Sequence, residues 1–219
     1  MPSAHGFRFR NNFPGVGLPT FLVGPEPDAG NRRGPAFGLC GGMSAAAADY
    51  FLAGRAIPSV TQVPTRGSVL YEFLYLRQAE SIGPGVATAL RFVQAMRQSD
   101  IELRRATEQE IPAIRDAVRL RGVAPIGLVL ARFGGPPGAN AASDNHQVLA
   151  VAVRDQDGHT VIDIYDPNYP GDDAVTIVLD GAEPGPVGRL VRGGGSRSKP
   201  VRGLLVVPYT PRTPPADPA

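Results

Sequence analysis

The segment Phe37-Gly38-Leu39-Cys40-Gly41-Gly42-Met43 places the only cysteine of the chain at the start of a predicted helix. The residues after it are mostly strong helix formers up to Gly54, which is a good helix terminator. One face of this helix is apolar at helical spacing, and it consists of Met43, Ala47, Tyr50 and Phe51. We therefore expect a buried helix that begins at Cys40.

The position of Cys40 favours nucleophilic chemistry. A thiol in the first helical turn lies at the positive end of the helix dipole, which stabilises the thiolate relative to the thiol. Gly41 and Gly42 leave the backbone around the sulfur open, so that their N–H groups can face a developing oxyanion. The alternative is that Cys40 is a small buried hydrophobe, which is the usual role of a free cysteine.

Length and composition limit the class of protein. The 219 residues suffice for one domain with its own core, and a single cysteine excludes an internal disulfide. There is no signal-peptide pattern and no apolar run long enough to cross a bilayer, so we expect a cytoplasmic protein, or one exported without a cleavable signal peptide. The net charge of +2, with scattered arginines, argues against nucleic-acid binding.

The order of predicted elements indicates an α+β fold. Residues 6–13 alternate apolar and polar, as in a half-buried strand. Helices are predicted at 68–78, at 86–98 and from the capping-box pattern Thr107-Glu108-Gln109-Glu110 to Gly122. Short apolar or β-branched runs then predict five strands, at 126–132, 146–153, 159–165, 174–179 and 201–207. Helices followed by an antiparallel sheet are typical of α+β domains.

We expect residues 1–210 to form a single domain. Within it, the glycine-rich segment 181–200 is predicted to be a flexible insertion. The tail 211–219 is rich in proline and is predicted to be disordered.

A cysteine nucleophile needs a base and a group that orients the base. Of the three histidines, His5 lies near the terminus and His159 follows a turn, whereas His146 opens an apolar strand. If 146–153 and 159–166 form a hairpin, Asp166 or Asn168 lies beside His146. The alternative is an ordinary loop histidine and a turn-forming aspartate.

This order of residues resembles papain-like cysteine peptidases. Three phrases carry the resemblance: Gly38-Leu39-Cys40-Gly41-Gly42-Met43, Asn145-His146-Gln147-Val148-Leu149-Ala150 and Tyr165-Asp166-Pro167-Asn168. They are most similar to bacterial members such as the double-glycine leader peptidases and a group of bacterial papain-like hypothetical proteins. The resemblance implies N-terminal helices packed on a C-terminal antiparallel sheet, with Cys40 as nucleophile, His146 as base and then acid, Asp166 as orienting residue and Asn168 in reserve. It also implies a peptide or protein substrate and no cofactor.

One feature departs from that family. Papain-like peptidases usually carry a glutamine shortly before the cysteine as oxyanion donor, and the residues before Cys40 contain none. The remaining candidates are the backbone at Cys40 and Gly41 with the side chain of Asn31, Asn11 or Asn12. Removing one such donor costs on the order of 100-fold in rate or more.

Several other functions compete with a peptidase. Gly38-Leu39-Cys40-Gly41-Gly42 also fits the nucleophile elbow of α/β-hydrolases, but that fold needs a preceding strand and an acid before the histidine. A metal site has little support because no closely spaced Cys/His cluster exists. An inactive papain-like binding module would keep the fold without the chemistry. On the same three residues, deamidation or acyl transfer, as in transglutaminases, is an alternative to hydrolysis.

Overall fold

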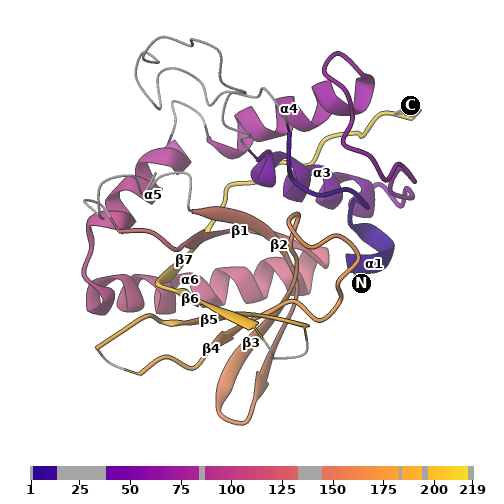
Figure 1. Cartoon of the computed structure of the whole chain (residues 1–219). Helices are drawn as coiled ribbons and strands as arrows, with labels where there is room; N and C mark the ends of the chain where they lie inside the picture. Colours follow the sequence, from indigo (N-terminus) through magenta and orange to yellow (C-terminus); the bar gives the residue numbers. More distant parts are fainter. Residues whose placement is uncertain are drawn as a thin grey trace.

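The computed structural model describes residues 2–13, 38–83, 87–132, 145–182, 184–193 and 197–216. Its helices are α1 (Pro2–His5), α3 (Cys40–Leu52), α4 (Val69–Ser81), α5 (Ala87–Arg97) and α6 (Asp100–Arg121). Its strands are β1 (Ala124–Val129), β2 (His146–Gln156), β3 (His159–Tyr165), β4 (Thr176–Leu179), β5 (Gly188–Arg192), β6 (Arg197–Val201) and β7 (Gly203–Val206). Helices precede strands along the chain, and this mixture of helices with an antiparallel sheet is compatible with the predicted α+β class (Figure 1).

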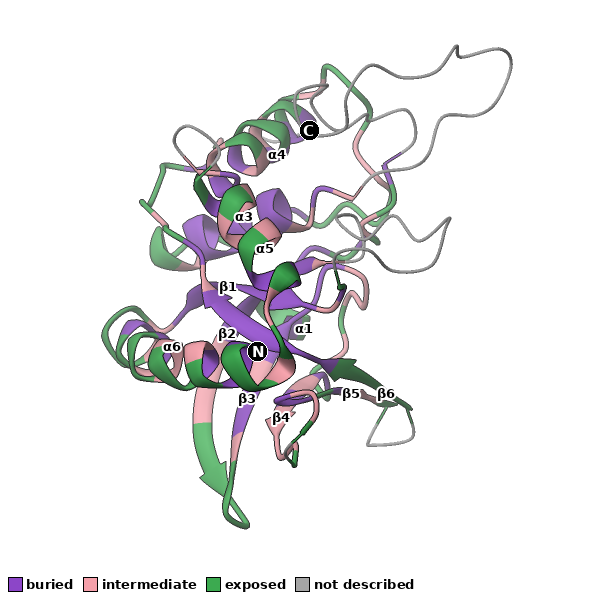
Figure 2. Ribbon diagram, turned by 90° about the vertical axis from the view of Figure 1, so that its left-hand side faces the viewer, coloured by how far each residue is buried: buried purple, intermediate pink, exposed green. Residues whose placement is uncertain are grey.

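The strands form one antiparallel sheet in the order β6-β5-β4-β3-β2-β1-β7. Consecutive strands are neighbours except for β7, which crosses back to pair with β1. The hairpin of β2 and β3 is exposed at its tip and buried at its other end (Figure 2). His146 begins β2 at the buried end, and Asp166 follows β3 at the same end.

Helices pack on both faces of the sheet because side chains alternate along each strand. Leu149 belongs to a core cluster that includes Met43 and Ala47 of α3. Its neighbours on the other face of β2 belong to a cluster with Ile114 and Ala117 of α6. The helix that carries Cys40 therefore lies directly against the strand that begins with His146.

Helix α4 confirms its predicted start. Ser68 has an extended backbone, and its hydroxyl accepts a hydrogen bond from the Tyr71 N–H at 3.3 Å, as an N-cap residue does. Leu74 is fully buried in the cluster that contains α3. The helix expected at 86–98 is also present, as α5.

Helix α6 begins earlier than the sequence pattern indicated. Ser99 is its N-cap and forms a capping box with Glu102, whereas Thr107 lies inside the helix. The Thr107 hydroxyl donates to the Leu103 carbonyl at 2.8 Å and accepts from the Leu204 N–H at 2.9 Å. Glu110 accepts from the Val206 N–H at 2.8 Å. The pair that resembled a capping box instead binds α6 to the edge of β7.

The alternating segment 6–13 is not a strand apart from an isolated bridge at Phe13. Phe7, Phe9 and Phe13 are buried in the cluster that surrounds α3. The alternation of apolar and polar residues therefore reflects the burial of three aromatic rings, and it does not reflect pairing with another strand.

Two segments expected to be flexible are packed where the structure describes them. Within 181–200, β5 and the first part of β6 pair with each other, and Leu190 is buried. In the tail, the Arg212 N–H donates to Asp49 at 2.9 Å, and the carbonyl of buried Pro214 accepts from Arg55 at 2.5 Å. Residues 211–216 are therefore held against the end of α3, by buried Asp49 within the helix and by Arg55 just after it.

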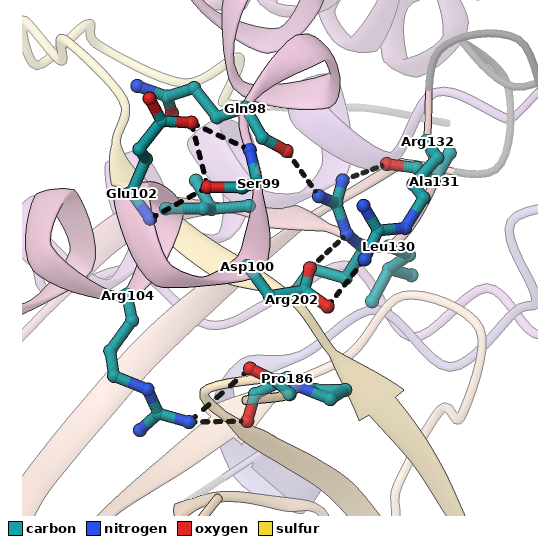
Figure 3. Close-up of polar contacts among 12 residues, drawn as sticks. Gln98, Ser99, Asp100, Glu102, Arg104, Leu130, Ala131, Arg132, Pro186 and Arg202 are labelled. Atoms are coloured by element: carbon teal, nitrogen blue, oxygen red, sulfur yellow. Dashed lines mark hydrogen bonds and ion pairs between the residues drawn. The ribbon is translucent and has the colours of Figure 1, made fainter. Parts of the chain in front are cut away.

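Arg202 connects the sheet to the turn between α5 and α6 (Figure 3). Its buried guanidinium bonds the Asp100 carboxylate at 2.8 Å, the Ala131 carbonyl at 2.7 Å and the Gln98 carbonyl at 2.7 Å. The bond to Ala131 holds the chain two residues after β1, whose Leu128 pairs with His146 at the start of β2.

Among the helices that the structure describes, none has the length and apolarity needed to cross a membrane.

Candidate active site

Cys40 is the first residue of α3 and is partly exposed. The chain enters the helix at Leu39, whose N–H donates to the side-chain oxygen of Asn11 at 2.5 Å. In the first turn, the Gly42 N–H donates to the side-chain oxygen of Gln78 at 2.9 Å. Side chains from two distant segments therefore hold the start of the helix. No acidic residue lies in the first turn to cancel its positive potential.

Two opposing effects act on the thiol of Cys40. Burial of the sulfur raises its pKa because a thiolate is poorly solvated there. A hydrogen bond with His146, the charge of that ring and the backbone N–H groups of Gln147 and Gly41 act in the opposite direction. The hydrogen bonds and the charge of His146 together outweigh the effect of burial, so the pKa of Cys40 is lowered.

His146 is held by Asp166. The register of β2 and β3 pairs Leu149 with Tyr165, so the two strand ends lie side by side. The distance from His146 Nε2 to Asp166 Oδ1 is 2.7 Å, and both side chains are buried. Since Nε2 faces the carboxylate, Nδ1 is the ring nitrogen left for Cys40.

The charges of this pair support each other. Burial lowers the pKa of the His146 ring, but the charge of Asp166 and the hydrogen bonds to Asp166 and Cys40 raise it to about 10. Burial likewise raises the pKa of Asp166, and the charge of His146 lowers it to a net value below its usual range. The arrangement favours an imidazolium between a carboxylate and a thiolate.

Asn168 lies beside the same histidine. Its N–H donates to Asp166 Oδ1 at 2.9 Å, and its side-chain nitrogen lies 3.2 Å from His146 Nε2. When Nε2 carries a proton, that nitrogen cannot accept from Asn168. Asp166 is thus the stronger partner of the ring, and Asn168 holds the carboxylate.

The oxyanion candidates lie in different places. Gly41 is buried beside Cys40 in the first turn, where helical N–H groups lack intrahelical acceptors. Asn12 is exposed. The side-chain nitrogen of Asn11 faces Asn168, at 3.3 Å from its side-chain oxygen. Asn31 lies outside the described residues.

Two neighbours of His146 complete the site, and their roles were not predicted. Asn145 accepts at its side-chain oxygen from the N–H groups of Leu130, at 3.0 Å, and Ala131, at 3.3 Å, and so secures the start of β2. Gln147 is buried on the opposite face of the strand. Its Oε1 has no hydrogen-bond partner among the residues that the structure describes, and it would lie 2.6 Å from a Cβ added to Gly41. Because side chains alternate along a strand, the sequence could have indicated that Gln147 points to the face opposite His146.

The other histidines lie elsewhere: His5 packs its ring on Phe51, with centroids 5.2 Å apart, and His159 is at the exposed hairpin tip. Within the described ranges, no group of three or more His, Cys, Asp or Glu side chains is arranged to hold a metal ion. Cys40, His146 and Asp166 lie together where the start of α3 meets the buried end of the β2–β3 hairpin.

Comparisons of the chain with protein-family models, with curated proteins and with solved structures find no match.

Proposed function

We propose that this protein is a papain-like, cysteine-dependent hydrolase that cleaves peptide or amide bonds with Cys40, His146 and Asp166. The observation that carries the proposal is the 2.7 Å contact of His146 Nε2 with Asp166, which leaves the other ring nitrogen for the hydrogen bond with the partly exposed Cys40. Cys40 as nucleophile, His146 as base and Asp166 as the group that orients the base then lie next to one another in this order.

In the first half of the reaction, the Cys40 thiolate adds to the carbonyl carbon of the substrate. The oxygen becomes an oxyanion, and the backbone N–H groups of Cys40 and Gly41 at the helix start are its donors. As the C–N bond breaks, the His146 imidazolium gives its Nδ1 proton to the leaving amine. A thioester on Cys40 and a neutral His146 remain.

In the second half, His146 accepts a proton from water as the water adds to the thioester carbon. The C–S bond then breaks, the acid product leaves, and Cys40 returns as the thiolate. Asp166 keeps the ring in one orientation and stabilises its positive form through both halves.

The first test is the pH dependence of Cys40 alkylation by iodoacetamide. The wild type is expected to react with an apparent thiol pKa well below the free value of about 8.5, and His146→Ala to lose this shift. His159→Ala is the matched control because it removes a histidine from the exposed end of the same hairpin. A slow thiol that is indifferent to His146 would contradict the proposal and favour a binding module.

The second test uses blocked peptides and mass spectrometry. Hydrolysis is expected with the wild type and not with Cys40→Ser. Added hydroxylamine should divert part of the product to a hydroxamate if a thioester forms. Products formed only with an amine acceptor would instead indicate acyl transfer, and loss of ammonia from a glutamine side chain would indicate deamidation.

A further inference from the structure

Asn11 bridges the two sides of the candidate active site. Toward α3, its side-chain oxygen accepts from the Leu39 N–H at 2.5 Å, one residue before Cys40. Toward the sheet, its side-chain nitrogen donates to Asn168 at 3.3 Å, and its own N–H donates to the Pro167 carbonyl at 3.0 Å. The same side chain therefore contacts the residue before the nucleophile and the turn that holds the base.

The orientation of both amides follows from one backbone group. The Leu39 N–H can only donate, so the atom of Asn11 that faces it must be Oδ1. The Nδ2 of Asn11 then points to Asn168, which must turn its own oxygen to meet it. The Nδ2 of Asn168 is consequently the atom that lies 3.2 Å from His146. The hydrogen-bond chain thus runs from the start of α3 through Asn11 to Asn168, whose backbone N–H donates to Asp166, the partner of the His146 ring.

The packing around Asn11 leaves it little freedom. A Cβ added to Gly38 would overlap the Asn11 amide, with 2.8 Å to its carbon. The absence of a side chain at position 38 lets the segment before the nucleophile approach Asn11 closely. A displacement of Asn11 would therefore be passed to Leu39 and so to Cys40.

We propose that Asn11 is a positioning residue that sets the separation between Cys40 and His146 by joining Leu39 to Asn168. Asn11 acts through these two residues and needs no contact with the substrate. This inference deepens the proposed function and rests on it. It replaces the role of oxyanion donor for Asn11, because both ends of its amide are already engaged.

The test compares Asn11→Ala with Asn12→Ala, which changes the neighbouring exposed asparagine. The readout is the pH profile of Cys40 alkylation. Asn11→Ala is expected to move the apparent thiol pKa upward by about one unit, equivalent to a roughly tenfold loss of reactivity near pH 6, because the thiolate and imidazolium no longer align. Asn12→Ala should keep the wild-type profile. Thermal unfolding of each variant reports whether the fold is retained.

A folded Asn11→Ala protein with the wild-type profile would overturn the inference. If Asn11→Ala does not fold, Asn168→Ala is tested instead, because it removes the side chain to which Asn11 donates. This variant must then show the upward shift of the thiol pKa. With both variants folded, the double variant is expected to shift the pKa by less than the sum of the two single shifts, and additive shifts would contradict a shared chain.

If the wild type itself has an unperturbed thiol, the proposed function fails. If the wild type is activated and only the Asn11 effect is missing, this inference alone fails.

Discussion

His146 Nε2 lies 2.7 Å from Asp166 Oδ1, although 20 positions separate the two residues in the chain. The hairpin of β2 and β3 causes this contact because its first and last residues meet at the buried end. A carboxylate there serves to hold one ring orientation and to favour the charged ring.

Replacement of Asp166 by asparagine should therefore reduce the reactivity of Cys40. The neutral amide no longer favours the imidazolium, so the thiolate loses its counter-charge. We expect alkylation near pH 6 to fall roughly tenfold or more, since each unit of thiol pKa changes the thiolate fraction tenfold below that pKa. The control is Asp163→Asn in β3, the strand that Asp166 follows, where the carboxylate pairs with exposed Arg154. Equal rates for the wild type and Asp166→Asn would contradict the assigned role.

The stability of the protein should depend on the protonation of His146. Because the pKa of this ring is raised from 6.5 to about 10 on folding, the folded state binds the proton more tightly. The resulting stability is fully present below about pH 6.5 and is lost as the pH rises through 10. We expect the urea midpoint of Cys40→Ser to exceed that of Cys40→Ser/His146→Gln at pH 6, with the difference shrinking as the pH rises. Because Cys40 contributes to the raised pKa of His146, the loss in this background should occur at a lower pH than in the wild type.

The Cys40→Ser background removes the titration of the thiol from this comparison. A difference that stays constant from pH 6 to pH 10 would show that the charge of His146 contributes nothing to folding.

Gly41→Ala should destabilise the protein even though alanine is the better helix former. The gain in helix propensity is about 1 kcal/mol. The added Cβ would overlap Ser81 Oγ and Gln147 Oε1, and overpacking of this kind costs about 1–3 kcal/mol. We expect a lower urea midpoint for Gly41→Ala and partial recovery in Gly41→Ala/Ser81→Gly. An increase in stability for Gly41→Ala would mean that the helix start is less tightly packed than described.

Arg77→Ala should be among the most damaging substitutions outside the site. Its Nε lies 2.8 Å from the Asp49 carboxylate, and both side chains are buried. Removing one partner of a buried ion pair leaves the other charge uncompensated, at a cost of about 3–5 kcal/mol. The exposed pair of Arg119 and Asp116 provides the control, and Arg119→Ala should cost less than about 1 kcal/mol. Urea unfolding measures both, and similar losses for the two variants would contradict this account.

The local sequence determined most of the elements and the identity of the candidate triad. A serine before an apolar run predicts the start of α4, and the apolar, β-branched run at 146–153 predicts the first part of β2. The triad could be proposed because the chain has one cysteine and three histidines, and because strand pairing brings the ends of a hairpin together.

Tertiary structure decided the features that depend on partners distant in sequence. Thr107 and Glu110 resembled a helix start, but the edge of β7 binds them inside α6. Asp49 of α3 holds the backbone of Arg212, in a tail whose composition indicated disorder. Asn11 was one of several equal candidates until Leu39 and Asn168 were found on its two sides. Periodicity and capping patterns describe interactions between residues a few positions apart in the chain. The roles of these side chains depend instead on distant groups that only folding brings next to them.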